Sequence, residues 1–283
     1  SLSKPSKIPT SQSFSRFLTS QHLDILCLQE THAKSELIQQ RLDMQLKTHQ
    51  SIWTSHCGIV SLNPQVNIES LYVSIDDRVI LCRVSQPNNT FPSFTIMNIY
   101  APATHAQRYA FYANLLQTSY FQTMLSNMTT DTPLPSLHLD IILGDFNYDF
   151  KHFPSHLITD FSAPALEFLS SSYTNILSPV PLLDDDEPFQ MPQTDPHPTP
   201  LNRSQWIWHA LLLHHFKECS HQLQADPSIP TFRRESTFST IDYIFASQEL
   251  FSFATQTEIQ FISGAWTDHA LLRFKLRFTS DTH

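Results

Sequence analysis

The segment that most constrains the fold is Leu139-Asp140-Ile141-Ile142-Leu143-Gly144-Asp145-Phe146-Asn147. A short apolar run that stops at a glycine is typical of a strand buried on both faces of a sheet. Such a strand, ending in Asp145 and Asn147, can hold a catalytic acid and a phosphate-binding amide on a rigid support. The same pattern also fits an ordinary strand that leaves the sheet through a turn capped by Asn. Other parts of the chain must therefore decide between the two interpretations.

Polar side chains also end or precede several other predicted strands. The strand at residues 23–30 ends in Glu30, and the strand at 94–100 ends in Tyr100. Each has a structural explanation, since a carboxylate suits the N-terminus of a following helix and a tyrosine can be a core aromatic with a solvated hydroxyl. Neither residue indicates a function alone.

Two further acids lie near the C-terminal end. Asp242 is in the middle of the predicted strand at 239–245, where a carboxylate is costly unless it is paired. Asp268 and His269 precede the strand at 271–278, although a turn explains them equally well in a chain with 15 histidines. The ordered set, with all members except Asp242 at a strand end, favours a catalytic site over five separate coincidences.

Length and composition predict one soluble domain over residues 1–283. Apolar residues make up 41% of the 283 positions, which is enough for a packed core. The formal charge of −9 argues against a broad basic surface for nucleic acid, although it allows a local groove. The acidic, proline-rich stretch at 178–200 is interpreted as an exposed loop.

Apolar periodicity predicts helices at residues 11–21, 33–47, 104–128, 163–171 and 206–216 among more numerous strands. Asp76 and Asp77 are predicted to form a hairpin turn. Because strand pairs alternate with single helices, we expect a two-layer β-sandwich with helices outside. The chain has only three glycines, each expected at a turn: Gly58, Gly144 and Gly264.

The four cysteines do not have the spacing of a zinc site or a disulfide framework. Cys27 and Cys82 lie in apolar strand-like runs and are predicted to be buried thiols, which favours a reducing intracellular compartment. No apolar run reaches membrane-spanning length, so no membrane association is expected. The chain begins at Ser1 without Met, which suggests a fragment.

Five motifs in order resemble the endonuclease/exonuclease/phosphatase superfamily, whose members share the deoxyribonuclease I fold. They are Leu26-Cys27-Leu28-Gln29-Glu30-Thr31, Asn98-Ile99-Tyr100-Ala101-Pro102, Leu143-Gly144-Asp145-Phe146-Asn147, Ser239-Thr240-Ile241-Asp242-Tyr243-Ile244 and Thr267-Asp268-His269. The residues of these motifs are most similar to those of the endonuclease domains of non-LTR retrotransposons, with apurinic-site endonucleases as the nearest relatives of that branch. The resemblance extends from about residue 11 to residue 278.

The resemblance implies an α/β fold, a four-layer α/β/β/α sandwich, and hydrolysis of a phosphodiester with Mg²⁺ or Mn²⁺. It implies these roles: metal binding by Glu30 and Asp268; catalysis by Asp145, by His269 paired with Asp242, and by Tyr100; and phosphate binding by Asn147, Thr231 and Ser239. These roles are chemically consistent with one another. Mg²⁺ prefers hard oxygen ligands, and a histidine paired with a carboxylate favours its protonated form, which can bind a phosphate. DNA is the expected partner of a monomer that could be fused to a reverse transcriptase and act in the nucleus.

Three departures qualify this expectation. The first strand of the family, which carries an asparagine on the metal side, is missing ahead of the first helix. The usual Ser-Asp-His reads Thr267-Asp268-His269, which keeps the hydroxyl. Basic residues that could contact a phosphate backbone are few: Arg233, Arg234, Lys151, Arg108 and Arg203. A phosphatase or phosphodiesterase acting on a small or lipid-linked phosphate, and a degenerate non-catalytic domain, therefore remain alternatives.

Overall fold

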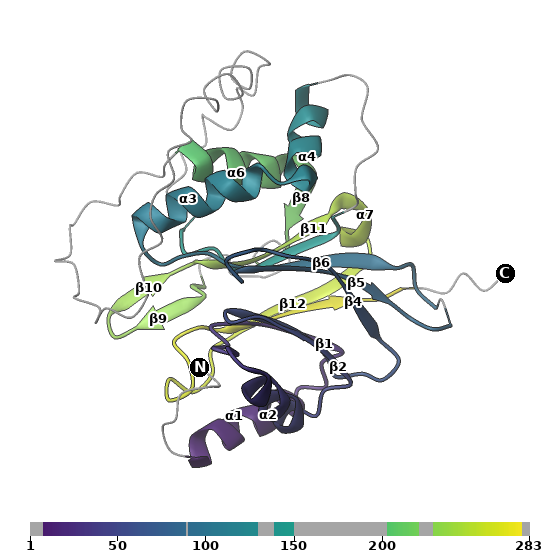
Figure 1. The fold of residues 1–283 in the computed structure, drawn as a ribbon, viewed down its shortest axis with the longest axis vertical. Helices are drawn as coiled ribbons and strands as arrows, with labels where there is room; N and C mark the ends of the chain where they lie inside the picture. The colour runs from purple at the N-terminus through teal and green to yellow at the C-terminus, as the bar shows by residue number, and fades with distance from the viewer. Residues whose placement is uncertain (1–7, 89, 130–138, 150–202, 221–228, 279–283) are drawn as a thin grey trace.

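The computed structural model describes residues 8–88, 90–129, 139–149, 203–220 and 229–278. Figure 1 shows four layers: α3, α4 and α6 cover one sheet, a second layer of strands faces that sheet, and α1 and α2 cover the far side. This is the predicted α/β/β/α sandwich. The helix predicted at 163–171, the loop at 178–200 and Lys151 lie outside the described residues.

The first layer of strands is one continuous six-stranded sheet in the order β4-β5-β6-β7-β11-β8. β6 and β7 are parallel, and every other neighbouring pair is antiparallel. The strands are β4 (Asn67–Val73), β5 (Val79–Ser85), β6 (Phe94–Tyr100), β7 (Ile141–Asp145), β11 (Asp242–Ser247) and β8 (Phe216–Glu218). The turn between β4 and β5 contains Asp76 and Asp77, as predicted; Asp77 has a φ of 59°.

The second layer of strands is divided into two separate pieces. One is β1-β3-β2 and the other is β12-β13, and no ladder joins them within the described chain. The bounds are β1 (Ile25–Gln29), β2 (Gln50–Trp53), β3 (Cys57–Ser61), β12 (Ala254–Gln260) and β13 (Leu271–Leu276). A short hairpin of β9 (Phe232–Arg234) and β10 (Thr237–Ser239) projects at the side of the molecule.

Three apolar clusters hold the four layers together. The first lies between the six-stranded sheet and helices α3 and α6, with Trp208 and Phe146 fully buried in it. The second lies between the two layers of strands, around Ile59 and Ile80, and the third packs α1 and α2 against β1 and β3. Burial of apolar surface at these three interfaces is the main source of stability.

The helices are α1 (Ile8–Thr19), α2 (Glu36–Leu46), α3 (His105–Leu116), α4 (Ser119–Thr129), α6 (Arg203–His215) and α7 (Gln248–Phe251). The single helix predicted at 104–128 is therefore two helices. The helix is interrupted at Gln117 and Thr118. The Thr118 hydroxyl donates to Leu115 O at 2.8 Å, and Thr118 O accepts hydrogen bonds from the amides of Phe121 and Gln122 in α4. Apolar spacing continued across the break, so periodicity alone did not reveal it.

Two of the three glycines lie inside strands rather than at the predicted turns. A Cβ at Gly58 in β3 would meet the Trp53 ring at 2.2 Å, and a Cβ at Gly144 in β7 would meet Ile99 O at 1.9 Å. Gly144 also has a φ of 137°, which residues with a side chain rarely adopt. Close packing, not chain reversal, therefore requires glycine at both positions, and only Gly264 lies in a turn.

Candidate active site

Neighbouring strands place three of the predicted site residues in a row across the six-stranded sheet. Tyr100 at the end of β6 is the register partner of Asp145 at the end of β7, and Asp145 is the partner of Asp242. Asp242 begins β11 instead of lying in the middle of a strand, because the chain changes from hairpin β9-β10 to β11 just before it. The sheet therefore holds all three side chains at one edge.

His269 joins this row from the other layer of strands. Its Nδ1 lies 3.0 Å from each carboxylate oxygen of Asp242, and its Nε2 lies 4.0 Å from Asp145 Oδ2. The His269 amide donates to Thr267 Oγ1 at 3.1 Å, so the threonine of Thr267-Asp268-His269 helps to fix the ring. The imidazole is thus oriented by one carboxylate and directed toward the other.

Burial and the neighbouring charges change the pKa values of this cluster. Burial raises the pKa of Asp145 well above its usual range, and the charge of Asp242 adds to that increase. Burial alone would lower the pKa of His269, but the Asp242 carboxylate outweighs it and raises this pKa to about 9. At neutral pH, His269 is therefore a cation between two acids.

Asn147 is held in a tight turn after β7. Its φ is 54°, its amide donates to Asp145 Oδ1 at 2.9 Å, and its side-chain nitrogen donates to Ala101 O at 2.6 Å and Asp145 Oδ2 at 3.2 Å. Arg108 of α3 donates to the Asn147 carbonyl. Arg108, predicted as a possible DNA contact, is half-buried and supports this turn.

Glu30 reaches the site from the end of β1. Its Oε1 accepts a hydrogen bond of 2.9 Å from the Tyr100 hydroxyl, and its φ is 53°. Burial raises the pKa of Tyr100 well above its usual range, and Glu30 adds to the effect, so the phenol stays a donor. Left-handed backbone at both Glu30 and Asn147 is a cost that functional sites commonly carry.

The remaining predicted residues lie at the margin of this centre. Thr231 is fully buried, and its Oγ1 accepts from the amides of Ile241 and Asp242 at 3.0 Å each. Ser239 ends β10, and its carbonyl accepts from the Thr231 amide. The Asp268 carboxylate forms an ion pair of 2.8 Å with Arg234. The Thr231 hydroxyl therefore supports the Asp242 backbone, and Asp268 engages a basic side chain.

The sequence of this chain matches one known protein family. The profile of the Endonuclease/Exonuclease/phosphatase family matches residues 6–269, which is nearly the whole chain. The chain belongs to this family. The members of this family are nucleases and phosphatases, which hydrolyse phosphate esters. No curated protein sequence matches the chain.

Solved structures agree on the fold. The endonuclease domain of TRAS1, a telomere-specific non-LTR retrotransposon, superimposes with a TM-score of 0.51 at 11% identity, covering 96% of this chain and 93% of that one. A 3′-5′ exonuclease from Neisseria meningitidis gives 0.57 at 14%, and an AP endonuclease from Archaeoglobus fulgidus gives 0.57 at 15%; both alignments cover 96% of each chain. These likenesses confirm a deoxyribonuclease I-like fold.

The donors that could hold a divalent metal of this family fall into two groups. Asp145, Asp242 and His269 have ligand atoms within 4.8 Å of one another. However, a protonated His269 repels a cation, and its Nδ1 is already bonded to Asp242. Glu30 offers a carboxylate whose Oε1 accepts the hydrogen bond from the Tyr100 hydroxyl. The hard oxygen donors of Glu30 and Asp145 fit Mg²⁺ better than the imidazole does.

Sequence reasoning missed several residues that position the site. Asn98 of β6 donates from Nδ2 to Leu28 O and Gly58 O and accepts from Gln29 at 2.6 Å, which ties the two strand layers together beside Glu30. Arg78 stacks 5.1 Å from the Tyr100 ring, and the His56 ring lies 5.8 Å from it. The sequence signals were that Asn98 is polar in an otherwise apolar strand and that it begins the motif ending in Pro102, although no role was predicted for it.

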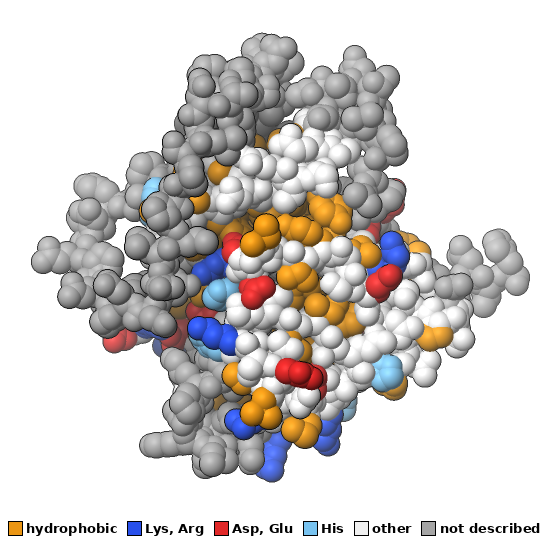
Figure 2. All heavy atoms as spheres, viewed as in Figure 1, with side chains coloured by type: hydrophobic (Ala, Val, Ile, Leu, Met, Phe, Trp, Pro, Cys, Tyr) orange, Lys and Arg blue, Asp and Glu red, His pale blue; other side chains and the backbone are white. Residues whose placement is uncertain are grey.

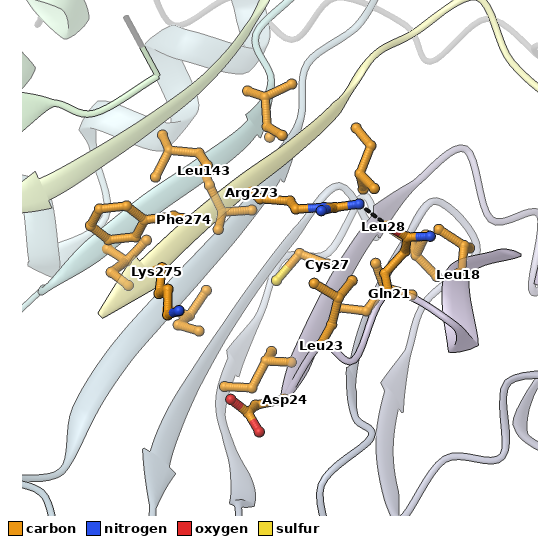
Figure 3. Close-up of a pocket in the computed structure, with 18 of the residues that line it drawn as sticks. Leu18, Gln21, Leu23, Asp24, Cys27, Leu28, Leu143, Arg273, Phe274 and Lys275 are labelled. Atoms are coloured by element: carbon orange, nitrogen blue, oxygen red, sulfur yellow. Dashed lines mark hydrogen bonds between the residues drawn. The ribbon is translucent and has the colours of Figure 1, made fainter. Parts of the chain in front are cut away.

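Among the described residues, no helix is long and apolar enough to cross a bilayer. Burial raises the pKa of the Cys82 and Cys219 thiols to about 12 each, and Cys57 is also buried. Cys27, predicted to be buried, retains some exposure because it lines a cavity between β1 and β13 (Figure 3).

Proposed function

We propose that this chain is a Mg²⁺-dependent DNA endonuclease of the retrotransposon type. The observation that carries the proposal is the arrangement of His269 between Asp242 and Asp145, with Glu30 and Tyr100 beside them. A protonated imidazole, a buried carboxylate and a second carboxylate are groups that can support hydrolysis of a phosphodiester.

His269 is assigned as the donor to a phosphate oxygen. With a pKa of about 9 it carries its proton at neutral pH, so it cannot also act as the general base. Asp242 keeps the ring oriented and charged through Nδ1, which leaves Nε2 for the substrate. The positive charge would stabilise the additional negative charge of the transition state.

Asp145 is assigned to orient and deprotonate the attacking water. Burial raises the pKa of Asp145, so it holds a proton more strongly than an ordinary surface carboxylate, which is the direction that favours a general base. Asn147 would hold the phosphate through Nδ2. Since Nδ2 already bonds Ala101 and Asp145, substrate must displace the longer bond to Asp145 Oδ2.

Glu30 would be the principal metal ligand, with Asp268 nearby. When bound, the metal supplies positive charge to the phosphate and the leaving oxygen. For Asp268 to take part, it must leave Arg234, whose side chain is 62% exposed and has room to move. Tyr100 would hold Glu30 in place, and the hydroxyls of Thr231 and Ser239 would lie on the phosphate side.

DNA as substrate is supported by the names of the structurally similar proteins, which include an AP endonuclease and a retrotransposon endonuclease domain. On the face in Figure 2, Lys and Arg side chains are scattered, and charged and histidine side chains gather beside the β9-β10 hairpin. Binding would therefore depend on this local region, in a monomer acting in the nucleus and fused to a reverse transcriptase.

The test is nicking of supercoiled plasmid by the purified chain with Mg²⁺, Mn²⁺ or EDTA. We expect metal-dependent nicking that falls at least a hundredfold in a His269→Ala variant. His49→Ala is the matched control, because this exposed histidine lies just before β2 and should leave the rate unchanged. Equal nicking by His269→Ala, or no nicking by the parent chain, would refute the endonuclease assignment.

A small-phosphate substrate is the second candidate, favoured by the net charge of −9. The same panel should then hydrolyse bis(p-nitrophenyl) phosphate or a phosphomonoester without nicking plasmid. If neither substrate is hydrolysed, the chain is a non-catalytic member of the family.

A further inference from the structure

The β9-β10 hairpin is joined to the candidate active site by main-chain hydrogen bonds. Arg233 N donates to Asp268 O at 2.8 Å, and Ala270 N donates to Thr231 O at 2.7 Å. These bonds align the first strand of the hairpin with residues 268–270. The hairpin projects at the side of the molecule in Figure 1, and most of its residues are exposed. One part of it therefore lies against the site while the rest lies in solvent.

Three side-chain contacts close a ring where the hairpin meets the site. The Phe232 ring lies 5.1 Å from the His269 ring in an edge-to-face arrangement. The Arg234 guanidinium lies 5.9 Å from the centre of the Phe232 ring, and its Nη2 forms an ion pair of 2.8 Å with Asp268 Oδ2. Since Asp268 directly precedes His269, the contacts form a closed set. We name these four residues the hairpin clasp: Phe232, Arg234, Asp268 and His269.

The ion pair is the contact of the hairpin clasp that is most easily exchanged. The side chains of Arg234 and Asp268 are 62% and 31% exposed, and water screens an ion pair in such a position. Nε and Nη2 of Arg234 both meet the same oxygen, Asp268 Oδ2, at 2.8 Å each. A guanidinium binds most strongly when its parallel donors meet two oxygens. A phosphodiester offers two such oxygens, so it can replace the carboxylate at Arg234.

The carboxylate held by Arg234 lies next to the catalytic histidine in the chain. Asp268 precedes His269, whose Nε2 lies 4.0 Å from Asp145 Oδ2. While the guanidinium is paired with it, the negative charge of Asp268 is largely neutralised. A freed carboxylate provides a hard oxygen donor, which is the kind that Mg²⁺ and Mn²⁺ prefer. A phosphate bound at Arg234 therefore makes the site more favourable to a cation.

Arg233 carries the same charge on the same hairpin but makes a different side-chain contact. Its guanidinium lies 5.4 Å from the centre of the Phe238 ring on β10. Its link to Asp268 is a main-chain amide, which a side-chain substitution leaves in place. Arg233 is therefore a matched control for the loss of positive charge at Arg234.

We propose that Arg234 couples the binding of substrate to the binding of the divalent metal. In the free chain Arg234 holds Asp268. A backbone phosphate of duplex DNA takes over the guanidinium, and the released carboxylate becomes an oxygen donor on the same side of the site as Glu30. DNA and the metal should then each raise the affinity for the other by the same factor. This coupling rests on the proposed function, which supplies DNA as the substrate and assigns Glu30 and Asp268 to the metal.

The first test measures Mn²⁺ binding to the DNA-free protein, from the electron paramagnetic resonance signal of the unbound ion. We expect Arg234→Met to bind Mn²⁺ about threefold more tightly than the parent chain, because the variant no longer competes for Asp268 through an exposed ion pair. Arg233→Met removes the same charge and should leave the affinity unchanged. Equal tightening in both variants would show a general charge effect, and no tightening in Arg234→Met would show no competition; either result overturns the proposal.

A second pair of variants identifies the carboxylate that is released. Asp268→Asn added to Arg234→Met should remove the whole gain in Mn²⁺ affinity. The same substitution in the parent chain should change the affinity much less, because Asp268 is already paired there. A gain that persists in the double variant would mean that another group binds the ion, which contradicts the proposal. The thermal midpoints should stay close to that of the parent chain, since the main-chain bonds of the hairpin remain.

The third test measures the coupling itself by fluorescence anisotropy of a labelled duplex, in EDTA and in Ca²⁺, with a gel to show that the duplex stays intact. The factor by which Ca²⁺ tightens DNA binding should fall about threefold in Arg234→Met, again the size set by an exposed ion pair. It should be unchanged in Arg233→Met. An undiminished factor in Arg234→Met would overturn the coupling.

None of these measurements requires turnover, so the two proposals can fail separately. A chain that shows this binding pattern without nicking plasmid would lose the endonuclease assignment and keep the coupling. A chain that nicks plasmid without this pattern would keep the assignment and lose the coupling.

Discussion

Asp145 and Asp242 lie on strands that pair on both sides, whereas Glu30 lies at the end of a strand that pairs on one side only. β7 is bonded to β6 and β11, and β11 is bonded to β7 and β8. β1 is bonded to β3, and its other edge lines a cavity between β1 and β13. The half of the site assigned to water and phosphate therefore lies within a sheet paired on both sides, and the half assigned to the metal lies on a strand paired along one edge.

Removing the carboxylate from the rigid half should have the largest effect. We expect Asp145→Asn to lower the nicking rate by about a thousandfold, because the variant loses the base while keeping the side-chain shape. Plasmid nicking at saturating Mg²⁺ measures this. Asp140→Asn, at the opposite end of β7, keeps an oxygen for the Thr95 amide and should leave the rate within a few fold. Comparable losses in both variants would mean that Asp145 acts only through stability.

The positions of Asp145, Asn147 and Asp242 near strand ends could be predicted because short stretches of neighbouring residues indicate them. Asp145 and Asn147 follow a recognisable buried strand, and the motif around Asp242 has the same character. The strand limits of Phe94–Tyr100 were also correct, since apolar residues and a following proline mark both ends. Even so, Asp242 was expected inside a strand rather than at its start, because the three-residue strand Thr237–Ser239 was too short to recognise.

The supporting contacts were beyond sequence reasoning because they join distant parts of the chain. Gln29 meets Asn98 across 69 positions, and Arg108 meets Asn147 across 39. No local pattern encodes such pairs. Gly58 shows the same limit: the Trp53 ring, not a turn, explains why a side chain is excluded. The order of motifs indicated which residues gather, and only the fold shows what holds them.

Breaking the His269–Asp242 pair should have the next largest effect. In Asp242→Asn the pKa of His269 should fall from about 9 toward its ordinary 6.5. Because the protonated ring is the active form, the rate in the parent chain declines as the pH rises through about 9, and in the variant through about 6.5. At pH 8 only about 3% of the ring stays protonated, which gives a loss of roughly thirtyfold.

The measurement is the pH–rate profile, together with the His269 pKa from an NMR titration. A falling limb that stays near pH 9 in Asp242→Asn would show that the carboxylate does not set the charge of the ring.

Removing the hydrogen bond that orients Glu30 should alter the affinity for the metal more than the maximal rate. Tyr100→Phe removes the hydrogen bond to Glu30, so the Mg²⁺ concentration for half-maximal nicking should rise about tenfold, as for other residues that orient a metal ligand. The rate at saturating Mg²⁺ should change little. Tyr72→Phe, on β4 at the far edge of the sheet, is the control. A lower rate at every Mg²⁺ concentration with an unchanged midpoint would instead place the Tyr100 hydroxyl on the substrate.

The smallest expected effect tests the link between the two layers of strands. Gln29→Ala removes the 2.6 Å bond to Asn98, which leaves Asn98 with its bonds to Leu28 and Gly58, so the free energy of unfolding should fall by about 1 kcal/mol. Gln40→Ala, which loses an exposed bond to Glu36, should cost less. Urea denaturation measures both. If β1 is fastened mainly by such bonds, the loss in Gln29→Ala should clearly exceed the loss in Gln40→Ala. Equal losses would mean that apolar packing already holds β1 firmly, and that the contrast between the two halves is one of hydrogen bonding alone.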